Sequence, residues 1–565
     1  MANYAAHIAE QSVFVVPPAI PGNFSGVPPL TFGASVIFSE WPKAGARTSS
    51  QPISQLQKVY PGAQVTSIND ALYHRMHIRP YAIDCGFVVA PQTHQMRVTN
   101  MHLESVEMTD LQTDNADVGI AMTGEDPPYT FLPLTDLEYI IYIDLSGAAS
   151  FNYVNSFSFY TGEHLRRPIV GIRTIVFGWA PQRDMTEMIE WLTDVQESYS
   201  GGEDRTQLRI APRHAYAGEY FERDPMGQAA MRNVVLGSQM QYFVVGLWHE
   251  SRRIGALSAG ATWIPVDTEY AEYRAGGFAL LRDTHWRDTE VVQVLEVQAG
   301  GLVLQEPLKR SYTLPDIMPA AVTRIDGKPG YAQGPNHTMY KIKFAADENW
   351  TIDAPASSVQ YKGFDTLLAP YNVSGAIAAR NIVRPADIID GQTGRVAVDP
   401  WQDWGRLATE EARFDPHSRA DAWAVRQWLH RRAGRFRPVW VPTFVEDIRI
   451  TTDFAGTDLT LEIEHVNYSD MLFSNPLCRH LAFFRTNGTI LLREIVAASA
   501  DASIYREWIT LDSALGFIGG QSDFTKISFL SLCRLVSDKV EIKWQRAGVG
   551  QTAVGIIGID HGSES

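Results

Sequence analysis

The sequence predicts a mainly β protein with a few helices, a β-rich α+β chain divided into several domains. Two observations lead to this class. Most segments are short runs in which apolar and polar residues alternate, the pattern of half-buried strands. At 565 residues the chain is also too long for one hydrophobic core, and ordinary domain sizes predict about three to five domains.

The first third of the chain predicts an arm followed by a β-sandwich. Residues 1–60 are rich in Pro, Gly and Ser and show little periodicity, which is typical of an irregular arm. From Ala82 onward the chain carries alternating runs such as "GFVVA", "QMRVTNMHLESVEM" and "EYIIYIDLSG". These runs predict antiparallel strands over residues 60–175.

A long hairpin, a helix and a strand are expected next. Residues 185–195 fit either a helix face or a strand, but the turn "SYSGGED" and the alternation of "RTQLRIAPRHAYAGEY" favour a hairpin. A helix is predicted from Pro225 to Gln239, with Asp224 as its N-cap. The apolar strand "YFVVGLWHE" follows and ends at Glu250.

The block 256–335 consists of short strands separated by Gly or Asp turns, which predicts a small inserted β-barrel. After it the earlier order returns. A hairpin is expected around residues 390–395, then a helix with Asp415 as N-cap and Pro416 as its first residue, then the strand in "GRFRPVWVPTF".

This last strand is expected to bury Val439, Val441 and Phe444. Pro438 and Pro442 cannot donate to a β-ladder, so they predict an edge strand or a bulge, where another subunit could meet it.

The recurring order predicts a tandem duplication. Glu250 aligns with Glu446 at an offset of 446 − 250 = 196, and Pro225 aligns with Pro416 at 416 − 225 = 191. The alternative is that a helix followed by a strand recurs by chance. This alternative would be supported if the two segments had different topologies in the structure. The predicted domains are an arm (1–60), a β-sandwich (61–178), a first module (179–255), an inserted barrel (256–340), a second module (341–470) and a C-terminal β domain (471–565).

Bulk charge and cysteine usage exclude several classes. The chain has 48 Lys and Arg against 64 Asp and Glu, a net charge of −16, which disfavours general nucleic-acid binding and fits a channel wall that lets DNA pass. Cys85, Cys478 and Cys533 show no metal-site spacing and are expected as buried thiols. No apolar run is long enough for a membrane-spanning helix.

Nothing in the sequence predicts a catalytic, cofactor or metal site. Glu187, Glu190 and Asp194 resemble paired carboxylates, but we expect solvated or ring-contact charges on a strand. His74 and His77 have no adjacent carboxylate and are expected in a surface turn. No nucleophile motif, Walker motif or HExxH motif occurs in a useful context.

The segment "IEWLTDVQESYSGGEDRTQLRIAPRHAYAGEY", together with "HRRAGRFRPVWVPTF" and "SFLSLCRLVSDKVEIKW", resembles tail tip proteins of long-tailed, siphophage-like bacteriophages, of the distal tail or baseplate hub type. The resemblance implies a structural virion protein, assembled in the host cytoplasm, with tail-tube-like modules. Its implied partners are the tail tube protein, other baseplate proteins and tail fibre proteins, with DNA passing unbound.

Two such modules in one chain predict that three subunits supply a ring of six modules, so a trimeric baseplate hub is favoured. The second hairpin has "RPADIIDGQTGR" in place of the Trp-Leu-Thr-Asp run. Because of this difference, a hexameric distal tail ring is the alternative to the trimer.

Arginine is the residue best suited to carboxylate pairing across an interface. The predicted inter-subunit contacts are Arg205, Arg209, Arg213, Arg253, Arg435 and Arg449, with contact to DNA as the alternative. A receptor-binding or glycan-binding role for the inserted block is a further hypothesis, suggested by Trp263, Trp286 and Trp350. A cell-wall enzyme is disfavoured because no acid/base constellation is evident.

Overall fold

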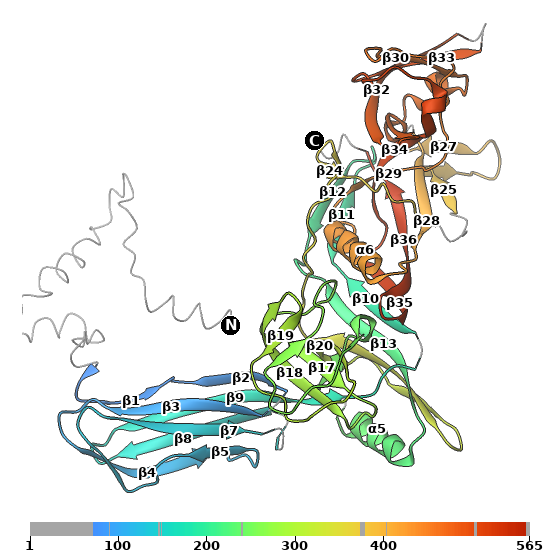
Figure 1. Ribbon diagram of the computed structural model, residues 1–565. Helices are drawn as coiled ribbons and strands as arrows, with labels where there is room; N and C mark the ends of the chain where they lie inside the picture. The colour runs from blue at the N-terminus through green and yellow to red at the C-terminus, as the bar shows by residue number, and fades with distance from the viewer. Residues whose placement is uncertain are drawn as a thin grey trace, which may run out of the picture. The chain divides into compact units, whose positions relative to one another are not determined.

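The computed structural model describes residues 72–89, 91–144, 147–148, 150–182, 184–238, 241–372, 379–402, 404–501 and 505–560. The chain divides into two compact units, Met1–Arg75 and Met76–Ser565. The arm expected over residues 1–60 lies outside the described residues. Strands dominate the described part of the second unit, which confirms the mainly β class with a few helices (Figure 1).

Two sheets enclose one core in the sandwich at the start of the second unit. One sheet has the order β1-β3-β7-β5, formed by β1 (Met76–Arg79), β3 (Gln92–Asn100), β7 (Asp136–Ile143) and β5 (Ile120–Thr123). The other is formed by β6 (Tyr129–Phe131), β4 (Val106–Asp114), β8 (Ser150–Phe159), β9 (His164–Phe177) and β2 (Ile83–Val88). Alternate residues of β8 are buried, as the period of two predicts.

The long hairpin predicted after the sandwich is confirmed. Its base pairs β10 (Met185–Glu190) with β13 (Arg213–Glu222), and its tip pairs β11 (Thr193–Glu197) with β12 (Glu203–Gln207). The helix alternative for residues 185–195 is therefore wrong.

The first helix is also confirmed. It is α5 (Pro225–Gly237), and the Asp224 side chain caps it by accepting from the Gly227 N–H at 2.9 Å. The following strand, β14 (Tyr242–Gly246), ends earlier than expected, because residues 248–250 form the short 3₁₀ helix η1 (Trp248–Glu250). Glu250 is thus on a turn instead of a strand.

The sheet of this first module is completed by strands from later in the chain. β14 lies between β9, which is parallel to it, and β20 (Asp316–Ile325), which is antiparallel. β20 pairs with β22 (Thr338–Ala346), and β22 pairs with β13 and with β21 (Gly330–Gln333). Residues 316–340 were expected within the inserted barrel, but their strands belong to this sheet.

The block inserted between β14 and β20 does not close into a barrel among the described residues. Its strands run in the order β16-β19-β18-β17, formed by β16 (Trp263–Pro265), β19 (Gly301–Leu304), β18 (Thr289–Gln298) and β17 (Phe278–Arg282). β17 then pairs with β20, and the short β15 (Arg252–Arg253) pairs with β20 as well. The ladder therefore continues into the module sheet and does not return to β16, so the barrel expectation is wrong.

The second module begins with the predicted second hairpin, which is confirmed. β25 (Arg380–Val383) pairs with β28 (Arg406–Phe414), and the tip pairs β26 (Ala386–Ile389) with β27 (Ala397–Pro400).

The second helix, α6 (Arg419–Arg432), starts later than expected. Ser418 caps it, and its Oγ accepts from the Asp421 N–H at 3.1 Å. Asp415 instead accepts from Arg413 Nε at 2.9 Å, so the N-cap expected at Asp415 is wrong.

The strand with two flanking prolines is not an edge. β29 (Val439–Pro442) pairs with β34 (Phe524–Leu535) on one side, and on the other Trp440 forms a parallel bridge with Thr366, directly after β24 (Phe364–Asp365). Pro442 is the last residue of β29. Its missing N–H therefore does not interrupt the hydrogen bonds in the middle of the strand. Val439 and Val441 are buried as predicted, whereas Phe444 is half-buried.

The rest of the second sheet follows the first module strand for strand. β34 pairs with β36 (Val549–Gly558), and β36 pairs with β28 and with β35 (Lys539–Arg546). A further block with its own core lies in sequence between β29 and β34. It contains β30 (Thr460–Glu464), η2 (Tyr468–Leu472), η3 (Pro476–Cys478), β31 (His480–Arg485), β32 (Ile490–Asp501), β33 (Arg506–Leu511) and η4 (Gln521–Asp523).

The two modules match in register as well as in order. Val245 lies opposite Ala321 and Val441 opposite Ser531, at offsets of 441 − 245 = 196 and 531 − 321 = 210. The helix N-caps differ by 418 − 224 = 194, which replaces the proline alignment at 191. One topology used twice, each time with a block inserted after the strand that follows the helix, is the duplication that the sequence predicted.

Each module packs its helix into a core of its own, so a buried helical leucine should support stability. Leu429 on α6 is fully buried, whereas Leu236 on α5 is 63% exposed. We expect Leu429→Ala to lower the free energy of unfolding by about 2–5 kcal/mol, because it removes buried methyl groups and leaves a cavity. Leu236→Ala is the matched control and should change it by less than about 0.5 kcal/mol. Urea unfolding of both variants measures this, and equal effects would contradict the assigned core.

Candidate functional site at the junction of the modules

The two modules are joined edge to edge by a pair of strands. β10 of the first module runs antiparallel to β35 of the second, from Met185 opposite Trp544 to Glu190 opposite Lys539. The hydrogen-bonded ladder therefore continues from one module sheet into the other.

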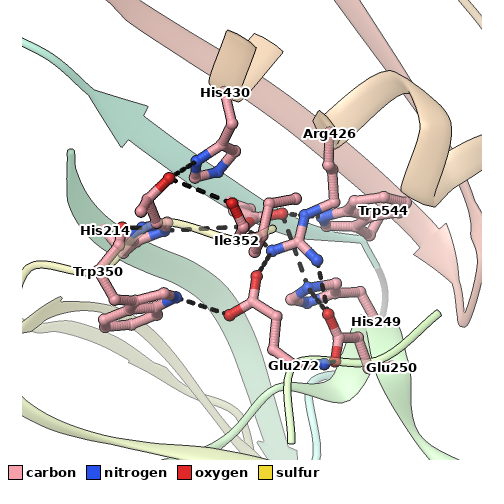
Figure 2. Close-up of polar contacts among 11 residues, drawn as sticks. His214, His249, Glu250, Glu272, Trp350, Ile352, Arg426, His430 and Trp544 are labelled. Carbon is pink, nitrogen blue, oxygen red and sulfur yellow. Dashed lines mark hydrogen bonds and ion pairs between the residues drawn. The ribbon is translucent and has the colours of Figure 1, made fainter. Parts of the chain in front are cut away.

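Arg426 on α6 lies close to this strand pair and forms ion pairs with three carboxylates of the first module and its inserted block (Figure 2). Its Nη1 donates to Glu250 Oε1 at 2.6 Å, and its Nη2 donates to Glu187 Oε1 at 2.8 Å and to Glu272. All four side chains are at most 4% exposed. Since Glu187 is on β10, Glu250 in η1 and Glu272 between β16 and β17, one guanidinium fixes three separate segments.

Aromatic donors satisfy the remaining carboxylate oxygens. The indole of Trp544 donates to Glu187 Oε2 at 2.9 Å, and the indole of Trp350 donates to Glu272 Oε2 at 2.7 Å. The backbone N–H of Glu272 donates to Glu250 Oε2 at 2.6 Å. A buried carboxylate is stable only when its lone pairs are met in this way.

Three buried histidines surround the cluster. His249 stacks on Trp544 with ring centroids 4.9 Å apart, and its Nε2 is 3.6 Å from both Glu187 and Glu250. His214 stacks on Trp350 at 4.0 Å and lies within hydrogen-bond distance of the Trp350 carbonyl, at 3.0 Å. His430 lies 3.1 Å from the Thr351 hydroxyl.

The pKa values of the three buried acids are shifted in different directions. Burial alone would raise the pKa of Glu187 and of Glu250, but Arg426 and the histidines outweigh it and hold both pKa values below their ordinary range. Burial raises the pKa of Glu272, and its two acidic neighbours raise it further against the opposing effect of Arg426. Burial would lower the pKa of Arg426, but the three acids keep it well above its ordinary value. Glu272 is therefore the acid that protonates most readily.

The cluster is packed as a core. The space beside it, lined by His249, Glu250, Arg426 and Trp544, has a volume of about 10 Å³. This is about the volume that one water needs, so the side chains of the cluster pack closely against one another.

A second contact clamps the tip of the first hairpin onto the second module. Glu203 on β12 accepts from Arg534 Nε at 2.6 Å and Nη2 at 2.9 Å, and Arg406 lies 3.4 Å away. The Glu203 side chain is fully buried, so the bidentate pair is shielded from water.

The six predicted arginines do not converge on one surface. Arg435 donates to Asp538 and to the Thr193 carbonyl, so it joins the two modules within the chain. Arg209 donates to the Glu190 carbonyl at 2.8 Å, and Arg205 is half-buried on β12. Three of the six are exposed: Arg213 on β13, Arg253 paired with Asp316, and Arg449 paired with Glu446. Their role between subunits stays a prediction.

The expectation for Glu187 was wrong, whereas Glu190 and Asp194 are exposed as expected. Glu187 alternates inward on β10, where Arg426 meets it from a helix 239 residues away in sequence. Its residue spacing carries no signal of this contact. Among the described residues no group of three or more His, Cys, Asp and Glu is arranged to hold a metal ion, and no helix is long and apolar enough to cross a membrane.

Removing the central guanidinium should lower the free energy of unfolding. Arg426→Met would leave three buried carboxylates without their cation, so we expect a loss of about 3–5 kcal/mol in the free energy of unfolding. Gln427→Ala, the next position on α6, loses one hydrogen bond and should cost about 1 kcal/mol or less. Urea unfolding at neutral pH tests both. Equal stability of Arg426→Met and wild type would rule out the assigned role.

The buried histidines should make the fold sensitive to acid. Burial lowers the pKa of His214 from 6.5 to about 4, and that of His430 to about 3. Between pH 6.5 and about 4 the unfolded chain holds a proton on His214 that the folded chain lacks, so unfolding takes up a proton. The free energy of unfolding should therefore fall by about 1.4 kcal/mol per pH unit for each such histidine as pH decreases through this window.

His214→Phe keeps the stacking on Trp350 and removes one titrating group. It should reduce that slope by about 1.4 kcal/mol per pH unit, as measured by urea unfolding from pH 7 to 4. An unchanged slope would mean that His214 is protonated in the folded chain.

Comparisons with known proteins give no family for this chain. No model of a known protein family matches the sequence, and no curated protein matches it. Among solved structures, the secreted serine protease VesC from Vibrio cholerae is similar at 7% identity and a TM-score of 0.15, with 47% of this chain and 48% of the protease chain covered. The chain thus spans about half the length of that protease, and a TM-score this low carries no argument.

Proposed function

We propose that this chain is a structural protein of a bacteriophage tail tip, a trimeric baseplate hub whose six modules form a ring around the path of DNA ejection. The observation that carries the proposal is the edge-to-edge pairing of two modules of one topology through β10 and β35. The family resemblance stated above supplies the biological setting.

Geometry supports a ring over a string of independent domains. The contact between the modules is heterologous, because one module contributes β10, η1 and its hairpin tip and the other contributes α6 and β35. Repeating a heterologous contact with a constant rotation produces either a closed ring or an open filament. With two modules in each chain, three chains supply the six modules that match a sixfold tail tube.

The net charge suits this role. A chain with a net charge of −16 does not attract the phosphate backbone, so DNA can pass a ring of such chains without being retained. The junction chemistry fits as well, because the polar cluster is closely packed and holds segments together. We therefore propose a structural protein and not an enzyme, located in the virion. Its proposed neighbours are the tail tube protein, other baseplate proteins and tail fibre proteins.

The stoichiometry of the purified chain tests the proposal. Native mass spectrometry together with light scattering should give three chains per particle, a mass of three times 63.0 kDa. Six chains would indicate the alternative, a hexameric distal tail ring. A monomer at all concentrations, and in the presence of purified tail tubes, would contradict a ring component of either kind.

A further inference from the structure

At the junction the helix and edge strand of one module receive the other module, and we call this helix and strand the receiving surface. Because the topology is duplicated, a second receiving surface exists, and no module covers it among the described residues. In the second module this surface consists of α6 and β35, and the first module covers it. Its counterpart in the first module consists of α5 and β21. All four residues of β21 are exposed, and among the described residues β21 pairs only with β22.

A groove marks this free surface. It has a volume of about 170 Å³ and is lined by residues that include Gln228, Arg232, Tyr331, Gln333 and Tyr340. Arg232 occupies the position of Arg426, since 426 − 232 = 194 is also the offset between the helix N-caps. At the covered junction the equivalent space is reduced to about 10 Å³, because His249 and Glu250 fill it. Arg232 is exposed and makes no hydrogen bond or ion pair that the described part of the structure shows.

The second module carries counterparts of the elements that the first module inserts at the junction, namely its edge strand and the turn after its central strand. β25 is the counterpart of β10, and among the described residues it pairs only with β28. Glu446 is the counterpart of Glu250, at 446 − 250 = 196, the offset of the strands that precede them. Its side chain is 36% exposed and accepts hydrogen bonds from Arg449 and Gln521.

The second hairpin has the same place in the topology, with Val396 at the position of Glu203, since 396 − 203 = 193. Its counterpart in the first module is clamped by Glu203 onto Arg534 and Arg406. The hairpin β26–β27 has no such clamp among the residues that the structure describes, and it exposes four apolar side chains, Ile388, Ile389, Val396 and Val398, at 50–71%. The positions equivalent to Arg534 and Arg406 are Arg324 (534 − 324 = 210) and Arg213 (406 − 213 = 193). Ile388 and Val398 are directly paired and share one face of the hairpin, which suits contact with another chain.

We propose that the second module of one chain docks onto the first module of a second copy in the same way as the two modules dock within the chain. In this contact β25 pairs antiparallel with β21, Glu446 enters the groove beside Arg232, and the hairpin β26–β27 lies near Arg324 and Arg213. The inference rests on the proposed function, because it specifies how the ring closes.

The register of the new strand pair follows from the junction. There Thr186 lies opposite Lys543. Thr186 corresponds to Ala379, by 379 − 186 = 193, and Lys543 corresponds to Ala332, by 543 − 332 = 211. Ala379 of one copy should therefore face Ala332 of the next.

Cysteine cross-linking tests this register. The double variant Ala332→Cys, Ala379→Cys should form disulfide-linked dimers and trimers under mild oxidation, because directly paired strand residues lie within disulfide distance. The control pairs Ala379→Cys with Gly330→Cys, two residues out of register, and should cross-link at least about tenfold less. Both single variants should remain uncrosslinked. An assembled wild type whose double variant fails to cross-link would overturn the inference.

Charge reversal tests the groove. Arg232→Glu and Glu446→Arg should each weaken association of chains by about 30-fold or more, because each places like charges in the buried contact. The double variant should recover most of the affinity, measured by sedimentation at several concentrations. Circular dichroism checks that each variant is folded.

Failure of this inference differs from failure of the proposed function. A trimer that neither substitution weakens would leave the ring standing and overturn the docking surface. A wild-type chain that stays monomeric would overturn both.

Discussion

The structure depends on one buried guanidinium. Arg426 lies where α6 of the second module meets β10, η1 and the inserted block of the first, and it donates hydrogen bonds to an acid from each of the three. Burying three carboxylates around one cation is costly unless every oxygen has a donor, and here indole N–H groups and a backbone amide provide the others. The cluster therefore ties α6 of the second module to three separate segments, and removing its cation would leave buried charges uncompensated.

The same module topology occurs twice in the chain, so each element of the junction has a counterpart in the other module. The first module inserts an edge strand, a turn and a hairpin into a surface made by a helix and a second edge strand. The second module contains the counterparts of the inserting strand and hairpin, β25 and β26–β27, and the first contains the counterparts of the receiving helix and strand, α5 and β21. The two inserted blocks leave the module sheets in register, since both enter the chain between the same two strands.

Local pattern was sufficient to predict much of the fold. Alternation in the runs after Ala82 predicted strands, and the Asp224-Pro225 pair marked the start of a helix that the structure confirms. Prediction failed where residues distant in sequence determine the position of a side chain or strand. Asp415 was expected to cap α6, but Arg413 binds it and Ser418 takes that place. Pro438 and Pro442 suggested an edge, yet Trp440 meets a segment more than 70 residues earlier in the chain. Glu187 was expected in solvent because nothing in its neighbourhood of sequence indicates a helix 239 residues away.

We propose that one module contact is used twice, once within a chain and once between chains. A reconstruction by electron cryomicroscopy of the purified assembly tests it most directly. We expect three chains arranged as six modules around a closed ring, with β25 of each chain continuing the sheet through β21 of the next. A particle in which the six modules do not alternate around one ring, or in which β21 and β25 both face solvent, would contradict it.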